Sequence, residues 1–135
     1  MKIPIRIDEH KSEPLYQQIK VQLRGLILGG QLPEGMLLPS IRELAGHLNC
    51  SVITIRRVYQ DLELEGLLRT KQGTGTFVAA VDQAVRESFR RETVKEAFEN
   101  AVDTGISVHL TGEEMIEIFE KVLKQKTGYP PSESD

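Results

Sequence analysis

Apolar residues in the first half of the chain recur every three or four positions, first over residues 41–48 and again over residues 55–62. This period is typical of a helix with one buried face, so the pattern predicts two short helices. Asn49 and Cys50 fall in the connection between them. Two helices joined so closely predict a helix-turn-helix, a motif that places its second helix in the major groove of DNA.

Each of these helices is preceded by a serine that can cap it. Ser40 stands three residues before Glu43, a spacing that predicts a capping box. Ser51 is favoured as the N-cap of the second helix, because its hydroxyl can accept a hydrogen bond from the first turn. No acidic residue occurs between Ser51 and Gln60. The first turns of the second helix can therefore approach a polyanion.

The pattern changes after Gly66, where the chain predicts a β-hairpin. Residues 67–70 and 76–79 are short apolar runs, and the Lys-Gln-Gly-Thr-Gly segment at 71–75 joins them as a turn. A hairpin that follows a helix-turn-helix forms a wing. The expected fold class is therefore mainly α with a small β-hairpin wing.

Upstream of this motif, the chain predicts one strand and one further helix. Ile3, Ile5 and Ile7 alternate with polar residues and proline, which is typical of a short edge strand. Apolar residues at helical spacing between positions 15 and 27 predict a helix that ends at the glycine pair 29–30. We expect this helix to cross the back of the helix-turn-helix.

The region after the hairpin predicts two more helices. Residues 82–104 have few helix breakers and indicate a long helix that ends at Gly105. Thr111 and Glu114 predict a second capping box at the start of another amphipathic helix. Two helices cannot cover both of their own apolar faces, so we expect them to pair with the same region of a second chain. The residues assigned to this dimerisation surface are Val85, Phe89, Val94, Phe98, Met115, Ile118, Phe119 and Val122.

These patterns divide the chain into three segments. Residues 1–79 are expected to form the winged helix-turn-helix domain, and residues 80–126 the two-helix dimerisation region. Residues 127–135 contain two adjacent prolines among serine and glutamate, a composition that predicts a disordered tail.

Charge is divided unevenly along the 135 residues, whose net charge is −3. Residues 1–79 hold 10 lysines and arginines against 8 acidic residues, a charge of +2, whereas residues 80–135 hold 7 against 12, a charge of −5. The positive first half agrees with a nucleic-acid partner, although the local placement of the arginines matters more than the sum.

Several classes of function find no support in the sequence. Cys50 is the only cysteine, which excludes an intrachain disulfide, and His10, His47 and His109 form no metal-ligand pattern with it. No nucleophile with a base and an orienting group is recognisable, so we expect no enzyme, no cofactor and no metal. No stretch approaches the roughly 18 apolar residues of a membrane span, so we expect a cytoplasmic protein without a membrane partner.

Many residues of the predicted winged helix share the spacing of one known family. They are Leu32-Pro33-Glu34-Gly35, Leu38-Pro39-Ser40, Arg42, Leu44-Ala45, Thr54, Leu62, Gly66 and the run Gly73-x-Gly75-x-Phe77-Val78. This set resembles the N-terminal domain of GntR-family bacterial transcription regulators, and the resemblance covers residues 14–79, about half of the chain. The short two-helix C-terminal region is similar to that of the YtrA-type subgroup.

The resemblance implies a homodimer that presents two winged helices to a palindromic operator in double-stranded DNA, as a transcriptional repressor. The C-terminal region is thin for a sizeable pocket. A cleft between two protomers remains as the place for a small-molecule effector, whose identity the sequence leaves open.

The expected DNA contacts centre on three arginines. Arg56 and Arg57 lie on the outward face of the second helix, and one of them is expected to hydrogen-bond a guanine edge or a phosphate. The resemblance favours Arg56 as the base reader. Arg42 matches the arginine of the family's Leu-Pro-Ser-x-Arg signature, which implies a phosphate or base contact. The alternative for Arg42 is an ion pair with an acid such as Glu43 or Glu65.

The residues at the start of the second helix include a departure from the family. Ser51 and Thr54 are compatible with phosphate contacts, although capping and helix surface alone can explain them. Val52 and Ile53 stand where the family often has arginine and a polar residue. Apolar side chains cannot donate to guanine, so we expect Ile53, together with Val52, to pack on thymine methyl groups.

The tip of the predicted wing is the last candidate site. Lys71, Gln72, Gly73 and Thr74 are expected to approach the minor groove or the sugar-phosphate chain, and the alternative is an ordinary hairpin turn that needs glycine. The competing function for the whole chain is a winged-helix protein-interaction module that does not read DNA sequence. The acidic C-terminal half fits that alternative.

Overall fold

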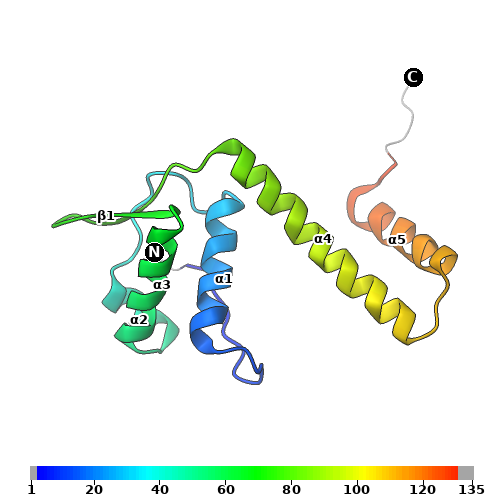
Figure 1. The fold of residues 1–135 in the computed structure, drawn as a ribbon, viewed down its shortest axis with the longest axis horizontal. Helices are drawn as coiled ribbons and strands as arrows, with labels where there is room; N and C mark the ends of the chain where they lie inside the picture. Colours follow the sequence, from blue (N-terminus) through cyan, green and yellow to red (C-terminus); the bar gives the residue numbers. More distant parts are fainter. Residues whose placement is uncertain (1–2, 131–135) are drawn as a thin grey trace. The chain divides into compact units, whose positions relative to one another are not determined.

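The computed structural model describes residues 3–130 of the chain. It consists of two compact units, and the first ends at Arg90 where the second begins at Arg91 (Figure 1). The division falls inside a helix, so each unit is described by itself.

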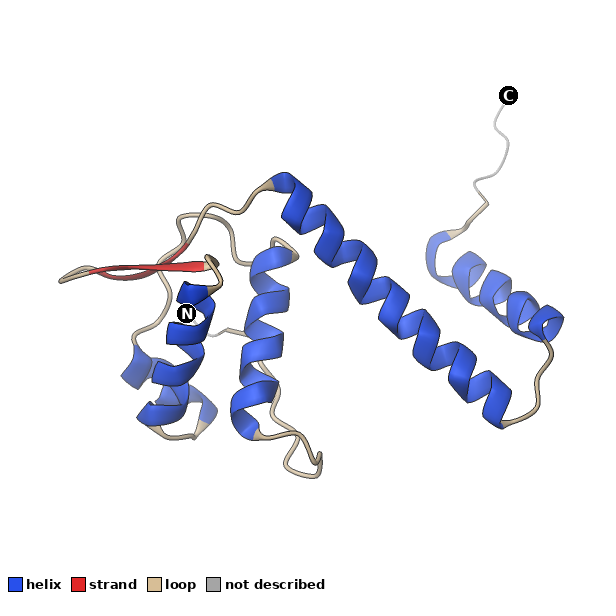
Figure 2. Ribbon diagram, viewed as in Figure 1, coloured by secondary structure: helices blue, strands red, loops and turns tan. Residues whose placement is uncertain are grey.

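The first unit is a winged helix-turn-helix. Three helices are followed by two antiparallel strands (Figure 2). Their bounds are α1 Leu15–Leu28, α2 Ile41–Leu48, α3 Val52–Leu64, β1 Leu68–Lys71 and β2 Gly75–Val78. The expected fold class is therefore confirmed, and so is the predicted order of these three helices and two strands.

The core of this unit lies where α1, α2 and α3 meet the base of the hairpin. Each helix contributes its predicted apolar stripe, because helical spacing places those side chains on one face. The fully buried side chains are Ile19, Leu23, Ile27, Leu44, Ile55, Val58, Leu62 and Val78. Because the α3 residues of this set face the core, the opposite face of α3 points outward.

The helix caps form as predicted. The Ser40 hydroxyl accepts a hydrogen bond from the Glu43 backbone at 3.1 Å, and the Glu43 carboxylate accepts one from the Ser40 backbone at 3.0 Å. The Ser51 hydroxyl accepts from the Thr54 backbone at 3.1 Å. Between the helices, Asn49 takes the left-handed conformation with φ of 56°, which turns the chain sharply enough for α3 to follow α2.

The wing has a third, shorter segment that the sequence pattern did not reveal. β1 pairs with β2 in the register Leu68 to Val78 and Lys71 to Gly75. On the other side of β2, Leu37 forms an isolated antiparallel bridge with Phe77. The backbone N–H of Leu38 donates to Thr76 at 2.9 Å, which continues this pairing. The turn before α2 thus supports the base of the wing.

The prediction of an N-terminal strand is wrong, although buried and exposed side chains do alternate along this segment. Residues 3–7 form no regular secondary structure and pair with no strand, although Ile3 is buried and Ile5 and Ile7 are partly buried. Instead, the amide of Gln22 accepts from the Arg6 N–H at 2.8 Å and donates to the Arg6 carbonyl at 2.7 Å. A glutamine side chain on α1 therefore satisfies the backbone groups that a neighbouring strand would otherwise pair.

Two further helices follow, α4 at Gln83–Ser107 and α5 at Gly112–Thr127. The second unit contains α5 and the part of α4 that begins at Arg91. The Thr111 hydroxyl accepts from the Glu114 backbone at 3.1 Å, and the Glu114 carboxylate completes the predicted capping box. The first turns of α4 belong to the first unit. There Arg86 donates to the carbonyl of Ile27 at 3.1 Å, and Phe89 packs against the core.

Two predicted boundaries in the second unit are wrong. Gly105 does not end α4, which continues to Ser107, because Gly105 is a buried packing position against Met115 rather than a cap. The predicted tail begins too early, because Thr127 is still helical and Gly128, with φ of 75°, caps α5. The part of that tail at 131–135 lies outside the described residues. No helix within residues 3–130 is long and apolar enough to cross a membrane.

Candidate nucleic-acid interface

The outward face of α3 carries an apolar and two cationic side chains. Ile53 is 75% exposed, and Arg56 and Arg57 are also exposed. Ile55 and Val58, on the opposite face, are fully buried. Since the buried stripe fixes the rotation of the helix, these outward residues are presented to a partner and not to the core.

At the N-terminus of α3, the hydroxyl groups of Ser51 and Thr54 contact each other. The side chains of Ser51 and Thr54 lie 2.9 Å apart, in addition to the capping bond between them. Ser51 is exposed and Thr54 is partly buried. Both residues therefore have the structural role expected for a cap, and Ser51 retains access to solvent.

Val52 differs from its predicted position on the DNA-facing surface. It is partly buried and packs against the core of the first unit, whereas its neighbour Ile53 points outward. Consecutive residues on a helix are about 100° apart, so the two side chains cannot share one face. The apolar surface available to a base is therefore that of Ile53 alone.

Arg42 is exposed on α2, and its proposed ion pairs do not form among residues 3–130. The Glu43 carboxylate accepts from the Ser40 backbone, and this hydrogen bond lowers the pKa of Glu43. Glu65 is bound by Arg24 and Lys20. The positive charge of Arg42 is thus not neutralised by either of the acids considered for it.

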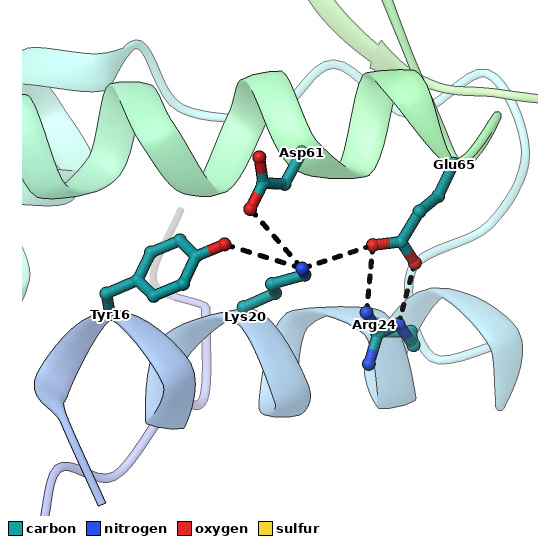
Figure 3. A network of polar contacts seen from close by, with 5 residues as sticks. All are labelled: Tyr16, Lys20, Arg24, Asp61 and Glu65. Atoms are coloured by element: carbon teal, nitrogen blue, oxygen red, sulfur yellow. Dashed lines mark hydrogen bonds and ion pairs between the residues drawn. The ribbon is translucent and has the colours of Figure 1, made fainter.

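A network of charged side chains joins α1 to α3 (Figure 3). Arg24 donates to both carboxylate oxygens of Glu65 at 2.9 Å each. The Lys20 ammonium lies 3.3 Å from Asp61 and 3.4 Å from Glu65, and it also donates to the Tyr16 hydroxyl at 3.4 Å. The hydrogen bond from Arg24 lowers the pKa of Glu65, which keeps this carboxylate ionised.

This network was missed in the sequence, although a signal for it was present. Lys20 and Arg24 are four residues apart on one helix, as are Asp61 and Glu65 on another. Residues four apart share a helix face, so two oppositely charged pairs predict facing helices. Asp61 and Glu65 are therefore engaged in ion pairs with α1.

Arg57 is also held from α1. Its guanidinium carbon lies 3.9 Å from the centroid of the Tyr16 ring, which is a cation–π contact. Tyr59, on the buried side of α3, donates its hydroxyl to the Pro39 carbonyl at 2.7 Å, and burial raises its pKa. The two tyrosines thus contact opposite sides of α3.

The tip of the wing is an exposed turn. Lys71, Gln72, Gly73 and Thr74 are all exposed, and the Thr74 N–H donates to the Lys71 carbonyl at 3.0 Å. Gly73 has φ of 81°, a conformation that favours glycine. On β1, Thr70 donates its N–H to the Glu63 carboxylate at 2.9 Å. The wing is therefore tied directly to the end of α3.

The residues assigned to dimerisation fall into two groups. In the second unit, Phe98 and Phe119 form an edge-to-face pair with centroids 5.4 Å apart, yet they remain 49% and 43% exposed. Val94, Ile118 and Val122 are similarly exposed, and Met115 is partly buried against Gly105. In the first unit, Val85 is exposed, whereas Phe89 is partly buried against the core.

Within residues 3–130 the structure brings no three histidine, cysteine, aspartate or glutamate side chains together in an arrangement that could hold a metal ion. Cys50 is a free thiol in the turn between α2 and α3, and burial raises its pKa. It is therefore protonated at neutral pH and packs as a small apolar side chain.

Comparison with known proteins agrees with the observed fold. The family model described as "Bacterial regulatory proteins, gntR family" matches residues 15–78. The chain is 32% identical over 116 residues to the HTH-type transcriptional repressor YtrA of Bacillus subtilis (strain 168), covering 86% of this chain and 87% of that protein.

Two solved structures show the same likeness. A GntR family transcriptional regulator from Listeria monocytogenes matches with a TM-score of 0.70 and 30% identity, over 85% of this chain and 98% of that one. The DNA-binding domain of AraR in complex with operator ORX1 matches with a TM-score of 0.51 and 32% identity, over 58% of this chain and 99% of that one.

Proposed function

Because this chain belongs to the gntR family of bacterial regulatory proteins, we propose that it is a sequence-specific transcriptional repressor that binds a palindromic operator as a homodimer. The observation that carries the proposal is the outward face of α3. Ile53, Arg56 and Arg57 are exposed there, on a stretch without acidic residues. Such a face fits the major groove of a polyanionic duplex.

Each exposed group has a role in this proposal. Arg56 donates to the O6 and N7 of guanine, an arrangement that suits the planar fork of donors on its guanidinium. Arg42 and Ser51 contact phosphates at the edges of the groove. The four residues of the wing tip, with Thr54 at the start of α3, complete the contacts to the backbone.

Dimerisation is the second part of the proposal. The second unit leaves a set of large apolar side chains at about half of their full exposure, including Val94, Phe98, Ile118 and Val122. A second copy of residues 80–126 would cover these groups through a self-complementary interface. Two copies of the winged helix, formed by residues 1–79, would then read two half-sites related by a two-fold axis.

The names of relatives support repression as the mode of regulation. YtrA of Bacillus subtilis is named a repressor, and the AraR domain was solved in complex with operator DNA. A dimer bound across an operator blocks access of other proteins to the same DNA. This function requires no catalytic group and no cofactor.

The test combines selection of DNA with measurement of mass. Wild-type protein would be used to select duplexes from a random pool, and its mass would be measured with and without the selected duplex. We expect a palindromic consensus, two protomers for each duplex, and affinity that falls steeply with salt. A monomer that enriches no sequence at low salt would reject the proposal and leave the protein-interaction module as the function.

A further inference from the structure

The position of Arg57 is determined by a side chain from another helix. Its guanidinium carbon lies 3.9 Å from the centroid of the Tyr16 ring, on α1. Arg56, the neighbouring residue on α3, is exposed and has no cation–π contact of this kind within residues 3–130. In the described chain, the Arg57 side chain is therefore held by a residue of another helix and the Arg56 side chain is not, although the two residues are adjacent in the sequence.

The Tyr16 ring is itself held in place. Lys20 donates to its hydroxyl at 3.4 Å, and the ammonium lies 5.7 Å from the ring centroid (Figure 3). Asp61 and Glu65 fix that ammonium from α3, at 3.3 and 3.4 Å. An aromatic ring supported in this way is a rigid platform for a cation.

Stacking leaves the guanidinium able to bind an anion. A cation–π contact uses the face of the guanidinium, so its N–H donors along the edge stay available. Within residues 3–130, Arg57 forms no ion pair. Asp61 and Glu65 are bound to Lys20 and Arg24, so these acids do not neutralise Arg57.

The stacking also sets the direction in which Arg57 points. Because Tyr16 lies on α1, the contact draws the guanidinium of Arg57 toward the flank of the outward face that adjoins α1. When a recognition helix lies in the major groove, its flanks face the phosphate chains on either side. A donor edge at this flank matches a phosphate oxygen rather than a base edge.

We propose that Tyr16 is a positioning residue that commits Arg57 to the phosphate backbone and thereby leaves base reading on α3 to Arg56. This inference rests on the proposed function, because it assigns roles within the same DNA-binding face. It predicts that replacing Tyr16, which lies on α1, weakens DNA binding. Tyr16 acts through Arg57 and makes no contact with DNA itself.

The test measures affinity for two duplexes over a range of salt concentrations by fluorescence anisotropy. One duplex is selected by the wild-type protein from a random pool, and the other has the same composition in scrambled order. Tyr16→Leu should weaken binding to both duplexes equally, by about two- to fivefold, the strength of an exposed cation–π contact. Arg57→Ala should lower the slope of log affinity against log salt by about one.

Three further variants separate positioning from folding. Tyr16→Phe keeps the ring face and should bind nearly as the wild type does. The double variant Tyr16→Leu, Arg57→Ala should bind no worse than Arg57→Ala alone, since both changes remove one interaction. Arg57→Lys keeps the charge at an exposed position but loses the planar stack, so it should weaken binding to both duplexes even if Tyr16→Leu does not fold.

Each contrary result has a distinct meaning. Additive losses in the double variant, or a loss confined to the selected duplex, would overturn the positioning role while the proposed function stands. Wild-type affinity in Arg57→Lys would do the same. A wild-type protein that binds neither duplex would overturn the proposed function and this inference together.

Discussion

Arg24 and Glu65 join α1 to α3 through two parallel hydrogen bonds of 2.9 Å each (Figure 3). A bidentate pair fixes both distance and orientation, which a single ion pair does not. Because α3 carries the candidate DNA contacts, this pair helps to set the angle at which they are presented.

The stability contributed by Glu65 is expected to depend on pH. The hydrogen bond from Arg24 lowers the pKa of Glu65 in the folded protein, below its ordinary value of about 4.3. The contribution is therefore complete above about pH 4.3 and is lost as pH falls through the lower, folded value. We expect Glu65→Gln to lower the free energy of unfolding by up to about 1 kcal/mol at pH 7.

Urea unfolding of both proteins at pH 7 and at pH 3 measures this difference. The gap between wild type and Glu65→Gln should narrow at the lower pH. Glu34→Gln is the matched control, because Glu34 is exposed and forms no ion pair within residues 3–130. An equal gap at both pH values would show that the carboxylate charge is not the cause.

Arg56→Ala should remove a base contact. If Arg56 is bidentate to guanine, the variant loses about 1–3 kcal/mol of specific binding and tolerates other bases at one position of each half-site. Competition between the selected duplex and a single-base variant of it measures both effects. Full affinity together with unchanged base preference would reject the assigned role.

Ile53 is expected to contact a thymine methyl group. Replacing the relevant thymine by uracil removes only that methyl, so the wild type should lose roughly 0.8 kcal/mol of binding, the value of one buried methylene. Ile53→Ala should bind the thymine and uracil duplexes equally. A uracil penalty of the same size in both proteins would place the methyl contact on another residue.

Gly105→Ala should destabilise the second unit. A β-carbon at this position would lie 3.0 Å from Cγ of Met115 and closer still to its sulfur. Overpacking of this kind typically costs about 1–3 kcal/mol. Gly112→Ala is the control in the same unit, since nothing lies within 4 Å of its added β-carbon. Thermal unfolding should separate the two variants, and equal melting temperatures would count against the packing argument.

Ile118→Lys should weaken the proposed dimer. Ile118 is 50% exposed in the described chain, and burying a lysine there against a second copy is costly. Sedimentation should show a shift from dimer toward monomer. Glu120→Gln makes the same change of one charge at another exposed position of α5 and should stay dimeric. If both variants sediment as the wild type, the interface lies elsewhere.

Sequence patterns predicted most of the first unit because helix caps and buried helix faces depend on residues that are close together in the sequence. The capping boxes at Ser40 and Thr111 and the cap at Ser51 depend on residues three apart, and all of them form. The buried stripes follow from helical period alone. The predicted strand at residues 3–7 does not form, because alternation indicates which side chains are buried but not what the backbone pairs with.

The order of elements, the caps and the outward placement of Arg56 were determined by the sequence, because each depends on neighbours within a few positions. Only the tertiary structure decided that Gly105 packs on Met115 instead of ending α4, and that Val52 turns to the core. It also decided that Tyr16 stacks on Arg57. These contacts join residues on different helices, and a linear pattern does not specify how two helices meet.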